Sequence, residues 1–225
     1  MNDKYDLFGD FKPVKGSSSM RLPLVLLLDT SGSMHGGGLW SKNSKIGDLN
    51  EKVSALVDYV RNDPKASQIT DLTIITFGGR VKVISQFKNI QDISFNKLQA
   101  SGTTPLGAAV NQAIDLILEQ KDKYVKAGVE YYKPRVIIMS DGAATDDYTQ
   151  AAKRCSKLVN DLVFKFYPIY IGSEDYAYIL KDFSPFLEPK TVENHEMFSE
   201  LFRSLSSSTS NPDDDPLERW FKDEF

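Results

Sequence analysis

The sequence predicts an α/β fold in which a mostly parallel sheet, with one antiparallel edge strand, carries helices on both faces. Short apolar runs alternate along the chain with longer segments whose apolar residues recur at helical spacing. A glycine pair at positions 78 and 79 separates two adjacent strand patterns, which is typical of a hairpin at a sheet edge. The 225 residues, 41% of them hydrophobic, are enough to form one core without a disulfide.

Each element follows from a local pattern. Continuous apolar runs predict strands that are buried on both faces, and apolar residues spaced by three and four predict helices with one buried face. Proline 64 ends the first helix, proline 105 begins the second, and Asn194 caps the last. In chain order, the predicted elements are a strand at Leu24–Asp29, a helix at Ile46–Asn62, strands at Asp71–Phe77 and Val81–Phe87, a helix after Pro105, a strand at Arg135–Ser140, a helix at Thr149–Leu162, a strand at Phe164–Ile171 and a helix from Asn194 to Leu205.

A polar pentapeptide, Asp29-Thr30-Ser31-Gly32-Ser33, directly follows the first apolar run. Open α/β sheets bind ligands at the carboxyl ends of their strands, and Gly32 lets this loop turn so that alternate side chains converge. Asp29, Ser31 and Ser33 then offer hard oxygen ligands, which suit Mg²⁺ or Mn²⁺ rather than zinc or copper. The loop therefore predicts a divalent-cation site.

Two later loops extend this pattern. They are Gly102-Thr103-Thr104-Pro105, before a helix, and Ser140-Asp141-Gly142, after a strand. From about Leu22 to about Ser206 the chain resembles the von Willebrand factor A domain, a Rossmann-like α/β fold whose metal-ion-dependent adhesion site uses such loops. Thr103 replaces a glycine of the usual family motif, so Thr103 stays an alternative to Thr104. The resemblance implies a metal site made by Asp29, Ser31, Ser33, Thr104 and Asp141, the last acting mainly through water.

The resemblance also implies a function. It indicates a non-enzymatic, magnesium-dependent interaction module, because these ligands leave a coordination position for an Asp or Glu of a protein partner. The segment from Ser140 to Asp147 is similar to the bacterial tellurite-resistance-associated branch, which implies a stress-response adaptor. An accessory subunit of a ring ATPase or metal-insertion complex is an alternative, since such subunits share the Thr-Pro-Leu loop. A magnesium-dependent phosphohydrolase is a weaker alternative, because Ser31 stands where haloacid-dehalogenase-type enzymes need a second aspartate.

Charge and composition exclude other classes of partner. Residues 211–225 carry six acidic and two basic side chains, a charge of −4 that equals the formal charge of the whole chain. The remaining body is formally neutral, which argues against nucleic-acid binding. We expect no membrane span, because no apolar run approaches ~20 residues. The lone Cys155, with no signal-like N-terminus, favours the cytoplasm.

The composition divides the chain into three parts. We expect a flexible segment at residues 1–20, the von Willebrand factor A domain at 21–206 and an acidic, aromatic-containing tail at 207–225. An acidic group of the tail is a candidate ligand for the metal site, in the same chain or by self-association, with Trp220 and Phe221 packing against the loop at residues 36–40. A frayed terminus and a docking peptide are the alternatives.

Overall fold

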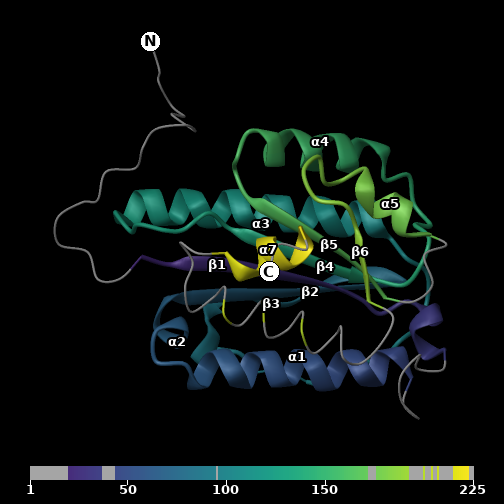
Figure 1. Cartoon of the computed structure of the whole chain (residues 1–225), viewed down its shortest axis with the longest axis horizontal. Helices are drawn as coiled ribbons and strands as arrows, with labels where there is room; N and C mark the ends of the chain where they lie inside the picture. The colour runs from purple at the N-terminus through teal and green to yellow at the C-terminus, as the bar shows by residue number, and fades with distance from the viewer. Residues whose placement is uncertain are drawn as a thin grey trace.

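The computed structural model describes residues 20–36, 44–94, 96–171, 176–192, 200, 204, 207 and 215–222. Helices α3, α4 and α5 lie on one face of a central sheet, and α1 and α2 lie on the other (Figure 1). The elements are β1 Leu22–Asp29, the 3₁₀ helix η1 Gly32–His35, α1 Lys45–Asn62, α2 Ala66–Ile69, β2 Thr70–Gly78, β3 Arg80–Asn89, the 3₁₀ helix η2 Ile90–Asp92, α3 Leu106–Ala127, β4 Arg135–Ser140, α4 Thr149–Asn160, β5 Lys165–Ile171, α5 Ala177–Lys181, β6 Lys190–Val192 and α7 Pro216–Phe221.

The described strands form one sheet in the order β3-β2-β1-β4-β5-β6. Strand β1 lies between β2 and β4, parallel to both, with Leu28 opposite Met139 of β4. Strand β3 pairs antiparallel with β2 at the sheet edge, as the glycine pair predicts, and Gly79 turns the hairpin at φ +67°. The predicted α/β fold is confirmed, including its antiparallel edge strand.

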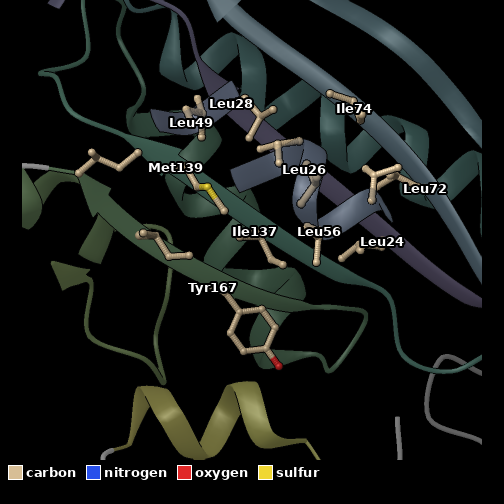
Figure 2. Packing of buried hydrophobic residues seen from close by; sticks show 14 of the residues in the cluster. Leu24, Leu26, Leu28, Leu49, Leu56, Leu72, Ile74, Ile137, Met139 and Tyr167 are labelled. Carbon is tan, nitrogen blue, oxygen red and sulfur yellow. The ribbon is translucent and has the colours of Figure 1, made fainter. Parts of the chain in front are cut away.

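Two apolar clusters hold the layers together, one on each sheet face. The first joins Leu24, Leu26 and Leu28 of β1 to the buried face of α1, and Figure 2 shows these leucines beside Leu49 and Leu56. The second packs the opposite side chains of the same strand against α3 and α4. Strand β1 is therefore apolar on both faces, and the change to a polar sequence after residue 28 marks the point where it leaves the core.

Some short elements had no sequence signal. Strand β6 has only three residues and belongs to the sheet because residues 190–192 pair with β5. Helix α4 ends at Asn160, two residues before the predicted end. Leu162 then adopts φ 55°, with which a helix cannot continue.

The predicted helix from Asn194 to Leu205 and the segment at residues 1–19 lie outside the described residues. Within the described ranges, no helix is both long and apolar enough to span a membrane.

The structure differs from the sequence prediction at the C-terminal tail. Residues 216–221 form α7, in which Leu217, Trp220 and Phe221 are buried in the same cluster as the first strand. Tyr167 of β5 points toward this helix (Figure 2), and its hydroxyl donates to Asp215 at 2.7 Å. The prediction missed this helix because its partners lie elsewhere in the chain. They are the basic side chains of Arg135 and Lys165 and the apolar cluster that contains β1, and the acidic run itself gives no sign of them.

Asp215 anchors the start of α7. Its carboxylate lies 2.7 Å from Lys165 Nζ and 3.3 Å from a guanidinium nitrogen of Arg135, which is buried. Arg135 begins β4, whereas Asp141 follows the end of the same strand, so Asp215 lies at the opposite end of the sheet from the predicted metal loops. Asp215 of this chain is therefore not a ligand at that site. Asp213, Asp214 and the loop at residues 37–40 lie outside the described residues.

Candidate metal centre

The sheet brings two acidic side chains together at its carboxyl-terminal edge. Asp29 is the last residue of β1, and Asp141 directly follows β4, its neighbour in the sheet. Both side chains are buried. The loop of residues 30–36 turns over them as η1, with the hydroxyls of Ser31 and Ser33 2.9 Å apart.

Asp29 is held by the protein on both carboxylate oxygens. Oδ1 accepts a hydrogen bond from the amide of Ser31 at 2.7 Å, and Oδ2 accepts from the hydroxyl of Ser140 at 2.5 Å. Burial raises the pKa of Asp29 to about 6, although the hydrogen bonds from Ser140 and Ser31 oppose this shift. Ionisation of buried Asp29 therefore destabilises the folded domain, and a bound cation would offset this effect.

Backbone hydrogen bonds fasten the threonine loop to the first loop. The amide of Gly32 donates to the carbonyl of Gly102 at 2.9 Å, and the amide of Ser101 donates to the carbonyl of Thr30 at 2.7 Å. Gly102 adopts φ +78°, and an added Cβ would lie 2.6 Å from Gly79 Cα of the β2–β3 hairpin. Only glycine allows this approach, so the hairpin glycines support the site as well as the sheet edge.

The structure distinguishes the two threonines. Thr104 is buried, whereas Thr103 is exposed and uses its carbonyl to accept from the amide of Gly79 at 2.7 Å. The Thr104 backbone is fixed by Thr145, whose amide donates to the Thr104 carbonyl at 2.9 Å and whose hydroxyl accepts from the Thr104 amide at 3.0 Å. Thr104 therefore lies with the other predicted residues, and Thr103 does not.

The hydroxyls of Ser31, Ser33 and Thr104 lie close together beside Gly142. A Cβ added there would lie 3.4 Å from the hydroxyls of Ser33 and Thr104, and 4.0 Å from that of Ser31. Asp141 joins these hydroxyls through its contact with Ser33, and Asp29 joins them through the Ser31 amide. The structure therefore brings together all five predicted residues, namely Asp29, Ser31, Ser33, Thr104 and Asp141. This donor set fits Mg²⁺ or Mn²⁺, which prefer carboxylate and hydroxyl oxygen.

Two other side chains complete the site, and sequence reasoning missed both. Lys45, the first residue of α1, places Nζ 2.6 Å from Asp141 Oδ2. Asp146 accepts from the amides of Gly107 and Ala108 and so caps the start of α3, the helix that follows Thr104. Asp146 belongs to an acidic run that could have suggested a cap, whereas Lys45 has no local signal because its partner is 96 residues away.

Cysteine and histidine side chains can also bind metals or react. Cys155 is buried in α4, and burial raises its pKa, which suits a packing residue rather than a nucleophile. His35 is exposed at the end of η1, while His195 lies outside the described residues. In the described part of the chain, no three His, Cys, Asp or Glu side chains gather into a metal-binding group, so the candidate centre depends on hydroxyls as much as on carboxylates.

Comparisons with known proteins agree with this geometry. The family model described as von Willebrand factor type A domain matches residues 24–143, which include all three loops. No curated protein matches the sequence. The von Willebrand factor type A structure from Catenulispora acidiphila is similar, with a TM-score of 0.61, 16% identity, and coverage of 86% of this chain and 43% of that one.

Two further solved structures, both described as holding a metal, are similar in fold. The mussel byssus proximal thread matrix protein 1 with a zinc-occupied MIDAS motif has a TM-score of 0.56 and 14% identity, covering 85% of this chain and 46% of that one. Manganese-loaded TRAP protein from Plasmodium vivax has a TM-score of 0.52 and 17% identity, covering 80% and 71%. The chain spans less than two thirds of the length of several similar structures. At these identities the likeness establishes the fold.

Proposed function

We propose a function from the premise that this chain belongs to the von Willebrand factor type A domain family. Domains of this family are often metal-dependent protein-interaction modules. We propose that this chain holds Mg²⁺ or Mn²⁺ with Asp29, Ser31, Ser33, Thr104 and Asp141 and binds an Asp or Glu of a protein partner there. The observation that carries the proposal is that the hydroxyls of Ser31, Ser33 and Thr104 lie together beside Gly142. The buried carboxylates of Asp141 and Asp29 are joined to this group by hydrogen bonds to Ser33 and to the Ser31 amide.

The carboxylates and the hydroxyls have different roles in the proposed site. Asp29 and Asp141 supply the negative charge, and Ser140 and the Ser31 amide fix the orientation of the Asp29 carboxylate. The hydroxyls of the two loops supply neutral oxygen ligands. A bound cation would supply a coordination position that accepts a carboxylate from outside. An outside carboxylate suits that position because it supplies the hard anionic oxygen that such a cation prefers.

We propose that the domain is not an enzyme. Ser31 takes the place of the second aspartate that the phosphohydrolase alternative needs, and its hydroxyl contacts Ser33. Asp29 is held from both sides by hydrogen-bond donors rather than presented to a substrate. Both features support a binding role.

We also propose a cellular role for this interaction module. The similarity of residues 140–147 to the tellurite-resistance-associated branch supports a bacterial stress-response adaptor, acting in the cytoplasm, where the buried and unpaired Cys155 would stay reduced. The alternative is an accessory subunit of a ring ATPase or metal-insertion complex, and the chains that co-purify with this protein would separate the two. Self-association through the tail would use Asp213, Asp214 or the terminal carboxylate, so replacing both aspartates by asparagine should weaken it.

Partner capture in Mg²⁺ and again in chelator tests the proposal. The wild-type chain and the Asp29→Ala variant are immobilised side by side and exposed to the same cell extract. We expect at least one partner that is retained only by the wild type and only with Mg²⁺. A set of bound proteins that is the same in all four conditions would contradict a metal-dependent role.

A further inference from the structure

Lys45 places a positive charge inside the candidate metal centre. Its ammonium lies 2.6 Å from Asp141 Oδ2, and the side chains of Lys45 and Asp141 are 18% and 0% exposed. The other Asp141 oxygen, Oδ1, accepts from the hydroxyl of Ser33 at 2.6 Å. The lysine is held in place as the first residue of α1, a helix whose start is capped by Ser44.

This arrangement changes the charge balance of the site. Asp29 and Asp141 carry two negative charges when ionised, and Lys45 cancels one of them. The ion pair is largely shielded from solvent, so its field acts on the neighbouring oxygen atoms with little screening by salt. A divalent cation beside Asp141 would meet a carboxylate that already has a cationic partner, and it would be repelled by that partner at short range.

We propose that Lys45 tunes the site in two opposite directions, weakening the binding of the divalent cation and strengthening the binding of an acidic ligand to the cation-loaded site. The second effect follows because two carboxylates neutralise the cation, so the ammonium leaves the loaded site with one net positive charge. A carboxylate is then attracted by both the cation and Lys45. This inference rests on the proposed function and specifies how the same site selects its partner.

The opposite signs separate this role from a structural one. If Lys45 only stabilised the fold by pairing with Asp141, its loss would disturb the site and weaken both binding events. If it acts through charge, its loss improves the first event and impairs the second. Lys52 serves as the control, because it carries the same charge on the same helix and lies 3.8 Å from Glu51. Removing its charge should affect neither event.

The experiment compares wild type with Lys45→Met, Lys45→Arg and the control Lys52→Met. Mg²⁺ affinity is measured by calorimetry. Acetate binding is measured on the Mn²⁺-loaded protein through the relaxation rate of water protons, which falls when acetate displaces water from the ion. For Lys45→Met we expect Mg²⁺ binding to tighten about tenfold and acetate binding to weaken by a similar factor, as expected for one nearby charge. Lys45→Arg, which keeps the charge, should stay close to wild type, as should Lys52→Met.

The outcomes distinguish the inference from the function on which it rests. If Mg²⁺ binds wild type and Lys45→Met equally, or if both affinities fall together, the tuning role is overturned while the metal site stands. If Lys45→Arg behaves like Lys45→Met, the effect is one of shape rather than charge, and the inference fails. If neither wild type nor Lys45→Met binds Mg²⁺ or Mn²⁺, the proposed function itself is overturned.

Discussion

Replacing Asp29 with asparagine should stabilise the domain at pH 7.5 in the presence of chelator, although it should abolish the response to Mg²⁺. Burial raises the pKa of Asp29 from an ordinary value of 3.8 to about 6. A shift of about two units corresponds to roughly 3 kcal/mol, which the folded state loses when this carboxyl ionises. Asparagine keeps the shape and can still accept from the Ser31 amide without carrying the charge.

The sign of the pH dependence follows from the raised pKa. The neutral form of Asp29 contributes its full stability below about pH 4, and the contribution is lost as the pH rises through 6. The free energy of unfolding of Asp29→Asn relative to wild type should therefore increase between pH 4 and pH 7 and then level off. Urea unfolding in chelator at a series of pH values measures this difference directly.

A second buried aspartate supplies the control. Asp71 is paired with Arg21, with 2.9 Å between Nε and Oδ2, and also accepts from the Tyr124 hydroxyl. Asp71→Asn should lower the free energy of unfolding at pH 7.5 by about 1–3 kcal/mol, because it weakens bonds to a cation. A destabilised Asp29→Asn, or a difference from wild type that does not change with pH, would refute the reasoning about the Asp29 charge.

Three other predictions test separate parts of the structure. Thr104→Val should weaken Mg²⁺ binding at least tenfold in calorimetry, while Thr103→Val should leave it unchanged; the reverse result would assign the ligand to Thr103. Leu217→Ala should lower the free energy of unfolding by about 3 kcal/mol in urea, because Leu217 of α7 is fully buried in the apolar core; an effect below about 0.5 kcal/mol would mean that α7 does not belong to the core. A generic phosphatase substrate with excess Mg²⁺ should show no turnover above background, and turnover that disappears in Asp29→Asn would favour the enzyme.

The sequence predicted the elements that carry a local signal. Strand β4 agrees with its predicted bounds, and α1 differs by one residue, because continuous apolar runs and helical spacing are strong where both faces of a sheet are covered. The five proposed metal-site residues lie together in the structure, since loops at the carboxyl ends of adjacent parallel strands must meet at one edge. Their role as ligands remains a prediction.

Features that depend on distant partners were missed. Lys45 belongs to the site because it pairs with Asp141, which is 96 positions away in the sequence. The carboxylate of Asp215 pairs with Arg135 and Lys165, which lie on two strands far from it in the sequence. In the sequence, the tail containing Asp215 reads as a solvated acidic segment. A run of acidic residues predicts a solvated segment unless a buried cation elsewhere in the fold can pair with it. Here that cation is Arg135, and the sequence alone does not show that it is buried.

The central claim is that the folded domain binds a divalent cation through the loops that contain Asp29, Thr104 and Asp141. Calorimetric titration of the purified chain with Mg²⁺, repeated with the Asp29→Ala variant, tests it most directly. We expect saturable binding of one ion at millimolar concentration or below, together with a higher melting temperature, since only the folded state brings these loops together. The variant should show neither effect. Absence of saturable Mg²⁺ and Mn²⁺ binding to the wild type, or equal binding to the variant, would contradict the claim.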